Sequence, residues 1–323
     1  MATGDQLKKL LAAYRDRDDS LFFRVAQGII SDETAANHHA LARDLKKALG
    51  DQRRAGELVL LPRDKGGVSL LNLAQSDVSA ERLVFSKSTA DKIGRVLEEH
   101  KAAATLAAFG YFPKKKLLFW GPPGCGKTMT AYYLAHELGL QIGTVRLSSL
   151  ISSYLGDTAQ HLDAVFETAN NTPMVLLLDE VDALGKSRDD PNDVGELKRV
   201  VNTLLQAMDR FTCKQSIVIA ASNHEYMLDP ALWRRFDDVV EFPLPAQFEI
   251  RTDLERLLNG VKLEGELSDA VELLDGFSFA DIERIAIEAV KTMILEHRTY
   301  LVIDDLVSQI KAFRKLPTNK GLN

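Results

Sequence analysis

The feature that most constrains this chain is a short apolar run that leads directly into a glycine-rich turn. Residues Lys116–Trp120 have the pattern of a buried strand, Gly121–Thr128 reads Gly-Pro-Pro-Gly-Cys-Gly-Lys-Thr, and helical spacing follows from Met129 to Leu138. Glycines allow successive backbone N–H groups to turn inward, and the N-terminus of a following helix attracts an anion. Strand, turn and helix together predict a loop that binds phosphate.

Two side chains of this loop indicate what it binds. Lys127 can reach the β- and γ-phosphates of a nucleoside triphosphate, and the Thr128 hydroxyl can ligate a bridging Mg²⁺ ion. The expected contacts along the loop are Pro122, Pro123, Gly124, Cys125, Gly126, Lys127, Thr128 and Met129.

Length, charge and cysteine usage narrow the class of protein. The 323 residues suffice for a nucleotide-binding core and one or two smaller domains. The formal net charge of −6 argues against a nucleic-acid-binding surface. The N-terminus lacks the layout of a signal peptide, and no apolar run is long enough to cross a bilayer. Cys125 and Cys213 form neither a disulfide framework nor a metal-binding spacing, so we expect reduced thiols in a cytoplasmic protein.

Residues 1–50 are predicted to form a small bundle of three amphipathic helices. Leucines recur at helical spacing from Leu7, a second apolar stripe runs from Leu21 to Ile29, and Ser31-Asp32-Glu33 resembles the start of a third helix. Its charged faces are read as solvated surface. The alternative is a module that docks a protein partner, and the chemistry of these residues does not decide between the two.

Residues 51–82 change character and are expected to hold the domain boundary. Two apolar runs, 57–61 and 68–73, flank Gly66-Gly67. This segment is either a hairpin or an irregular tether.

From residue 83 to 245, apolar runs alternate with helical patterns. Continuous apolar strands separated by helices predict an α/β fold whose parallel sheet is covered by helices on both faces. The strands are expected at 116–120, 142–147, 174–178, 217–221 and 239–242, and the helices at 89–110, 129–138, 159–170 and 196–208.

After Pro245 the strand pattern stops, and residues 246–323 are predicted to form a helical domain. Its helices are expected at 248–258, 267–274, 280–295 and 304–313. The predicted organisation is therefore a helical module (1–50), a linker or hairpin (51–82), a nucleotide-binding core (83–245) and a helical lid (246–323).

Three polar residues follow the apolar strands of the core. Asp179 can hold the magnesium ion, and Glu180, pointing to the other side of the strand end, can polarise a water molecule for attack on the γ-phosphorus. Asn223 follows the next strand and can orient that water or contact the γ-phosphate. Ligands of parallel sheets bind beyond the carboxyl ends of the strands, where these residues and the phosphate loop are all expected.

Over about residues 83–300, the chain resembles the AAA+ ATPases, in particular their AAA subgroup of ring-forming protein remodellers. The segments that carry the resemblance are Gly121–Thr128 (Walker A), Leu176–Ala183 (Walker B), Ala221–Asn223 (sensor 1), Asp229–Asp237 (the second region of homology) and Gly276–Asp281 (the start of a lid helix). The resemblance implies ATP as the nucleotide, Mg²⁺-dependent hydrolysis, and a ring, expected to be a hexamer. It also implies that Ala280 lines the nucleotide from the lid.

The same resemblance assigns roles to residues outside the loop. Arg234 and Arg235 would act as arginine fingers at the nucleotide of a neighbouring subunit. Many relatives separate the two arginines by two residues, whereas here they are adjacent, so both stay candidates for the phosphate contact, with Arg235 preferred. Ser153–Gly156 resembles a pore loop in which Tyr154 grips a polypeptide, and Arg199 is a candidate for coupling the pore to the nucleotide.

The favoured function is thus an ATP-hydrolysing remodeller, or unfoldase, that threads protein partners through a ring. No protease motif or HExxH is present, so any proteolysis would need a separately encoded protease. The alternative is a nucleotide-gated scaffold that regulates a bound effector without threading it. DNA work such as clamp loading is disfavoured by the acidic charge balance.

Overall fold

A computed structural model gives the fold of the chain. It describes residues 4–15, 19–35, 38, 41–45, 62, 69–147, 158–186, 194–224 and 230–315. The chain forms two compact units, residues 1–60 and 61–323, and each is described by itself.

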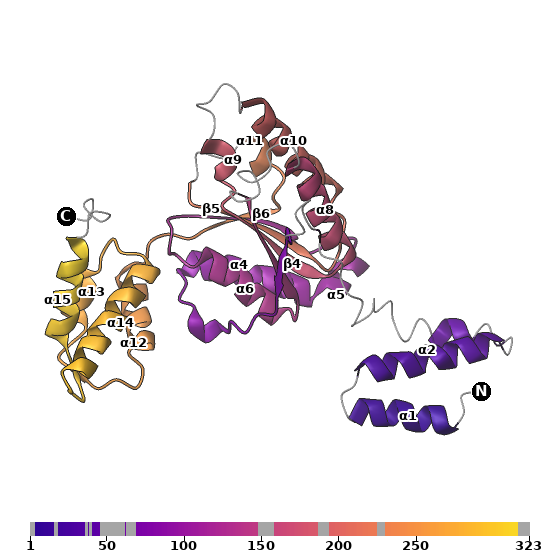
Figure 1. The fold of residues 1–323 in the computed structure, drawn as a ribbon, viewed down its shortest axis with the longest axis horizontal. Coiled ribbons are helices and arrows are strands. Elements are labelled where there is room, and N and C mark those ends of the chain that lie inside the picture. Colours follow the sequence, from indigo (N-terminus) through magenta and orange to yellow (C-terminus); the bar gives the residue numbers. More distant parts are fainter. Residues whose placement is uncertain are drawn as a thin grey trace. The chain divides into compact units, whose positions relative to one another are not determined.

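The N-terminal unit contains two helices that lie side by side, α1 (Gly4–Arg15) and α2 (Asp19–Ala35) (Figure 1). Gln6 Nε2, near the start of α1, donates to Asp32 Oδ2, near the end of α2, at 2.6 Å. The predicted helix start at Ser31–Glu33 is wrong, because these residues lie in the last turns of α2. The helix α2 continues through Ser31–Glu33 to Ala35, and within it the Thr34 hydroxyl donates to Ile30 O at 2.7 Å. A further helical stretch covers residues 41–45.

The larger unit is built on a six-stranded sheet with the order β1-β3-β4-β5-β2-β6. The strands are β1 (Asn72–Ala74), β2 (Lys116–Trp120), β3 (Gln141–Arg146), β4 (Met174–Asp179), β5 (Ile217–Ser222) and β6 (Asp238–Glu241). All neighbouring strands are parallel except β1, which is antiparallel to β3. The predicted parallel sheet is confirmed for β2 to β6, which begin and end within one residue of the expected positions.

Helices cover both faces of this sheet, as Figure 1 shows. One face carries α4 (Lys87–Lys101) and α6 (Lys127–Glu137), and the other carries α8 (Thr158–Asn171) and α10 (Val194–Arg210). Shorter helices are α5 (Ala103–Ala108), α9 (Ala183–Lys186), α11 (Pro230–Trp233) and the 3-10 turn η1 (Ala80–Arg82). The predicted helix over 89–110 is divided, since α4 ends at Lys101 and α5 follows it.

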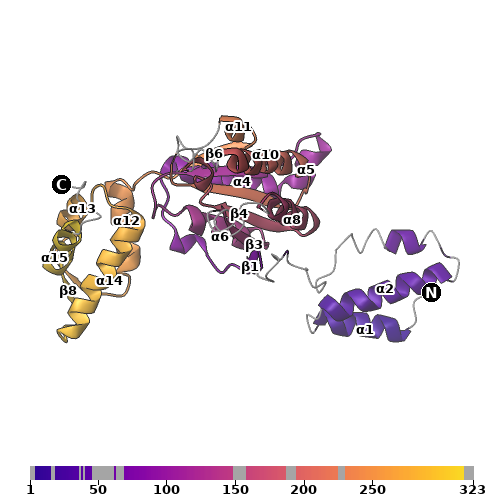
Figure 2. The ribbon, with the colours of Figure 1, turned by 45° about the horizontal axis from the view of Figure 1, so that its top comes forward.

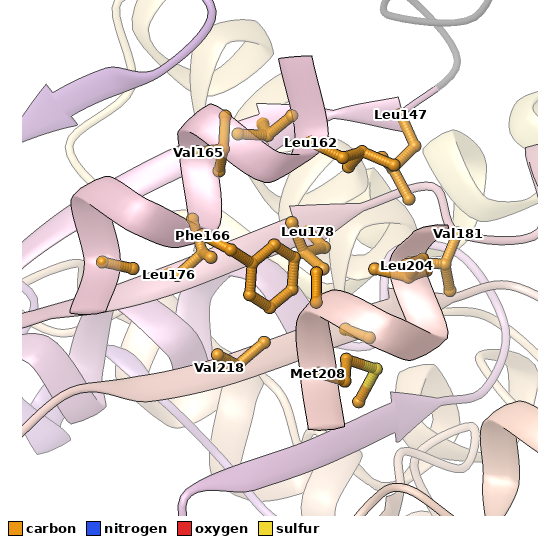
Figure 3. Packing of buried hydrophobic residues seen from close by; sticks show 14 of the residues in the cluster. Leu147, Leu162, Val165, Phe166, Leu176, Leu178, Val181, Leu204, Met208 and Val218 are labelled. Carbon is orange, nitrogen blue, oxygen red and sulfur yellow. The ribbon is translucent and has the colours of Figure 1, made fainter. Parts of the chain in front are cut away.

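Each face of the sheet has its own hydrophobic core because strand side chains alternate between faces. Leu176, Leu178 and Val218 point to the α8–α10 face, where they pack against Phe166 and Met208 (Figure 3). Leu117, Phe119, Leu177 and Ile219 point to the α4–α6 face. A sheet buried on both faces holds its strand ends in fixed positions, which is what a site at those ends requires.

The strand β1 shows that the sheet extends N-terminally of residue 83, the core boundary suggested by the sequence. Asn72 to Ala74 pair with Thr144 to Ile142, and Leu71 just before them is fully buried. Leu70 N donates to Pro62 O at 2.8 Å, so residues on either side of Gly66-Gly67 do meet. Most of the segment predicted as a hairpin or tether lies outside the described residues.

The C-terminal part is helical, with α12 (Gln247–Leu257), α13 (Ser268–Leu273), α14 (Phe279–Leu295) and α15 (Ile303–Arg314) packed together (Figure 2). Its core includes Leu254, Phe277, Ile285 and Leu306. The expectation that strands stop after Pro245 is wrong in one detail, because β7 (Leu263–Glu264) and β8 (Leu301–Val302) form a small parallel pair. Two-residue strands are too short to show an alternating pattern.

Candidate nucleotide site

The glycine-rich turn connects the end of β2 to the start of α6. Gly124 and Gly126 have φ of 75° and 90°, a left-handed backbone that glycine adopts without a Cβ clash. A Cβ on Gly124 would lie 2.5 Å from Ser278 Oγ and 3.0 Å from the Ala280 Cβ. Glycine at 124 is therefore required both by the turn and by the close approach of α14.

Lys127 begins α6 and is almost buried, with 7% of its surface exposed. Its ammonium donates to Gly121 O at 2.7 Å and to Pro122 O at 2.8 Å, both carbonyls of the loop. Burial lowers the pKa of this amine, while the nearby Cys125, Asp179 and Asp182 oppose that shift. The cation thus lies at the loop itself, where it can interact with phosphate oxygens.

Oxygen ligands meet beside the loop. The Thr128 hydroxyl donates to Asp179 Oδ2 at 3.2 Å, which joins the first turn of α6 to the end of β4. Hydroxyl and carboxylate oxygens are the donors that Mg²⁺ prefers, and the ion usually keeps several waters and phosphate oxygens as further ligands. Among the described residues, no group of three or more His, Cys, Asp or Glu side chains could hold a metal by itself.

Glu180 and Asn223 lie at neighbouring strand ends, because β4, β5 and β2 are adjacent. Glu180 has a φ of 57°, and its N–H donates to Asp179 Oδ1 at 2.9 Å. The chain therefore turns at this residue, and Asp179 and Glu180 both line one cavity instead of pointing to opposite sides as the strand pattern suggested. Asn223 follows β5, and its N–H lies 3.4 Å from Asp182 Oδ1.

A single cavity of about 740 Å³ brings most of the predicted residues together. Its lining includes Pro123 to Met129, Asp179, Glu180 and Asn223, all of which the sequence predicted. The segment before α4 and the lid helices also line it, through Arg82, Leu83, Val84, Phe85, Asp253, Arg256, Phe279, Ala280 and Glu283; of these, the sequence predicted only Ala280. Of the loop residues, Pro122 contributes a carbonyl to Lys127 and is not part of this lining.

The lid contacts the loop through the start of α14. Ser278 caps the helix, since its hydroxyl accepts from Asp281 N at 3.3 Å and donates to Asp281 Oδ2 at 2.7 Å. The N–H of Ala280, which has no partner within the first turn of a helix, donates to Gly124 O at 3.1 Å. This backbone contact places α14 directly against the phosphate loop.

Cys125 is a buried side chain of the glycine-rich loop, and its Sγ lies 3.8 Å from Pro123 O of the same loop. Burial raises the pKa of this thiol to about 11. The residue is therefore a small buried side chain that holds its proton at neutral pH.

The two candidate arginine fingers follow α11 and do not line the cavity. Arg235 Nε lies 3.5 Å from Asp209 Oδ1 at the end of α10, whereas Arg234 is exposed. Arg199 lies exposed on α10. Tyr154 and the rest of its predicted pore loop lie outside the described residues.

Sequence reasoning missed the Arg82–Phe85 segment and the α12 residues Asp253 and Arg256. Their spacing carries no motif: Arg82–Phe85 lies just before α4, and Asp253 and Arg256 reach the cavity from the lid helix α12. Phe279 could have been found, because it lies within the segment Gly276–Asp281 that already suggested Ala280.

Comparison with known proteins gives concordant findings. Residues 117–244 match the family described as ATPase family associated with various cellular activities (AAA). The chain is 39% identical over 305 residues to the uncharacterized AAA family ATPase y4kL of Sinorhizobium fredii, covering 92% of this chain and 91% of that protein.

Proteasome-activating nucleotidases are similar to a smaller part of this chain. The nucleotidase of Pyrococcus horikoshii is 39% identical over 209 residues, or 62% of this chain, and that of Thermococcus onnurineus is 33% identical over 277 residues, or 81% of this chain. The matches cover 52% and 68% of those proteins, so this chain spans about half the length of the Pyrococcus relative. Within the described residues, no helix is long and apolar enough to span a membrane.

Proposed function

The chain belongs to the AAA family of ATPases and hydrolyses ATP, and from this premise we propose that it assembles into a ring and remodels other proteins. The observation that carries the proposal is the cavity at the ends of β2, β4 and β5. It brings together an amine, oxygen ligands and a carboxylate, the kinds of group that phosphoryl transfer uses, which supports the proposal. The chain's own arginine pair lies outside that cavity.

Within the site, the backbone of Gly124–Thr128 and the Lys127 ammonium hold the triphosphate. The Thr128 hydroxyl and Asp179 would hold Mg²⁺, which would supply positive charge beside the β- and γ-phosphates. Glu180 polarises a water molecule for attack on the γ-phosphorus, and Asn223 orients that water. Ala280, whose N–H is bonded to the loop, keeps the lid closed over the nucleotide.

The remaining charge in the transition state requires a cation from a second copy of the chain. Arg234 is exposed, and Arg235 lies near Asp209, so the geometry favours Arg234 as the residue that reaches a neighbour's phosphate. Arginine fingers contribute about 10³–10⁵ in rate in well-studied phosphoryl-transfer systems. A ring, in which each subunit completes the next site, supplies this arginine to every site; a hexamer is the expected form.

The proposed partners are proteins. Support comes from the relatives named proteasome-activating nucleotidases and from the separate N-terminal unit, which is available to dock a client or effector. Tyr154 is proposed to grip the client in the central pore, which rests on the resemblance of residues 153–156 to pore loops. A separately encoded protease could then receive the unfolded client.

Two variants of the full chain test this function. Glu180→Gln should bind ATP without hydrolysing it and should retain the client in an ATP-dependent pull-down. Tyr154→Ala should keep its ATPase activity yet lose unfolding of the captured client. If Tyr154→Ala unfolds or controls that client as well as the unsubstituted protein, threading is wrong, and the chain acts as a nucleotide-gated scaffold. Hydrolysis by Glu180→Gln at an undiminished rate would contradict the assigned role of Glu180.

A further inference from the structure

Part of the cavity lining lies outside the loop and the strand ends to which the phosphates are assigned. If Gly124–Thr128 hold the triphosphate, the lining residues from the segment Arg82–Phe85 and from the lid helices α12 and α14 are left for the nucleoside. Two of them, Asp253 and Arg256, are charged residues of α12.

Asp253 is a buried carboxylate, with 3% of its side chain exposed. Burial raises its pKa above the usual range, Glu283 adds to the shift, and Arg256 opposes it. Its Oδ2 has no hydrogen-bond partner among the described residues. Burying a carboxylate is costly unless it is paired, so Arg256 supplies the interaction that keeps it there.

Arg256 is fixed by that carboxylate. Its Nε and Nη2 both donate to Asp253 Oδ1, at 3.0 and 2.8 Å. The third nitrogen, Nη1, carries two N–H groups that no described residue accepts. The side chain is 32% exposed, so the guanidinium is oriented by Asp253 and still accessible from the cavity.

We propose that Arg256 recognises the nucleoside: Nη1 donates a hydrogen bond to a neutral acceptor, either a ring nitrogen of the base or an oxygen of the ribose. Asp253 is the positioning residue that holds the guanidinium in place. The Asp253–Arg256 pair carries no net charge, yet it presents a hydrogen-bond donor in a fixed direction. Such a donor suits a neutral acceptor, whereas an arginine without a carboxylate partner would bind the phosphates. This inference deepens the nucleotide site and rests on it.

Equilibrium binding to the full chain tests the proposal with three ligands: ADP, ribose 5-diphosphate and inorganic pyrophosphate. Arg256→Met should weaken ADP binding roughly ten-fold, the loss of one hydrogen bond from a charged donor. Pyrophosphate binding should stay within about two-fold, since it lacks a nucleoside. A ten-fold effect on ribose 5-diphosphate as well would identify a ribose oxygen, and an effect on ADP alone would identify the base.

The matched control is Arg251→Met, an exposed arginine of α12 that does not line the cavity. It should leave the affinities for all three ligands unchanged. Because Arg256→Met leaves Asp253 buried without its partner, the double variant Asp253→Asn/Arg256→Met provides a folded alternative. It should bind ADP as weakly as Arg256→Met, and Asp253→Asn alone should weaken ADP but not pyrophosphate.

Two results would overturn the inference. One is an equal loss of ADP and pyrophosphate affinity in the double variant, which would make Arg256 a phosphate contact. The other is unchanged ADP affinity in a folded variant, which would make the pair purely structural. If the unsubstituted chain failed to bind ADP, the proposed nucleotide site itself would be wrong, whereas ADP binding that Arg256→Met leaves unchanged would contradict only the role of Arg256.

Discussion

Glu180 shows how one backbone angle shapes the part of the cavity that Asp179 and Glu180 line. Its left-handed φ of 57° is shared, among described non-glycine residues, only by His297. Such a conformation costs about 1–2 kcal/mol in a residue with a Cβ. The turn is held because Val181 N donates to Ala221 O at 3.0 Å and Ala183 N donates to Glu180 O at 3.0 Å. This strain allows two consecutive carboxylates to face one cavity.

At the residue scale, the raised pKa of Cys125 predicts a slow reaction with iodoacetamide. The thiolate is the nucleophile, and with a pKa of about 11 only about 0.1% of the thiol is ionised at pH 8. The alkylation rate should rise roughly ten-fold per pH unit up to pH 10, because the thiolate fraction does. In the unfolded chain the pKa of this thiol is about 8.5. The free energy of unfolding therefore includes the full contribution of the protonated thiol below pH 8.5, and that contribution is lost as the pH rises toward 11.

The measurement uses a Cys213→Ser variant, so that mass spectrometry reports on Cys125 alone. The same variant in denaturant provides the control and should react quickly at pH 8. Equal rates for the native and the denatured protein at pH 8 would contradict a buried, protonated thiol.

At the element scale, the packing of β1 against β3 requires that residue 143 of β3 is a glycine, which has no side chain. A Cβ on Gly143 of β3 would lie 2.9 Å from Leu71 Cδ1 and 3.0 Å from Met174 Sδ. Glycine at 143 therefore makes room for Leu71, which anchors the edge strand against the sheet. The order of β1 in the sheet follows from this packing rather than from strand propensity.

This packing predicts non-additive stabilities. Leu71→Ala should lower the free energy of unfolding by about 2–5 kcal/mol through the cavity it leaves. Gly143→Ala should cost about 1–3 kcal/mol by overpacking, and less when Leu71 is already alanine. The control is Gly94→Ala in α4, where nothing lies within 4 Å of the new Cβ, and where about 0.5–1 kcal/mol should be gained. Additive costs in urea unfolding would contradict the contact.

The same elements show what could be predicted from the sequence. Local patterns located the strands and the phosphate loop, because a strand buried on both faces is continuously apolar and the loop needs glycine at fixed positions. They did not locate β1, whose three residues are held by contacts across about seventy positions of chain to β3. They also missed the part of the cavity lining that α12 supplies, since Asp253 and Arg256 reach the cavity only when α12 packs beside the core.

At the scale of the whole molecule, the basic residues among the described ones that line the cavity are Lys127, Arg82 and Arg256. Of these, only Lys127 belongs to the glycine-rich loop, and Arg234 and Arg235 lie outside the cavity. In the proposed ring, a heterologous, head-to-tail contact between copies would bring one subunit's arginine to the next subunit's nucleotide, and repetition of that contact would close the ring. Activity should then be a property of interfaces rather than of single chains.

Mixing two inactive variants tests this directly. Glu180→Gln retains its arginine, Arg234→Ala retains its carboxylate, and each alone should be nearly inactive as an ATPase. When the two are mixed in equal amounts before assembly, about a quarter of the interfaces pair an intact Glu180 with an intact Arg234, so ATPase activity should return to a similar fraction. Arg235→Ala provides the comparison. If the pairing of Arg235 with Asp209 is structural, this variant alone should retain much of its ATPase activity, and mixing it with Glu180→Gln should restore nothing further. A mixture no more active than its components would place the required arginine elsewhere or show that hydrolysis needs no second subunit.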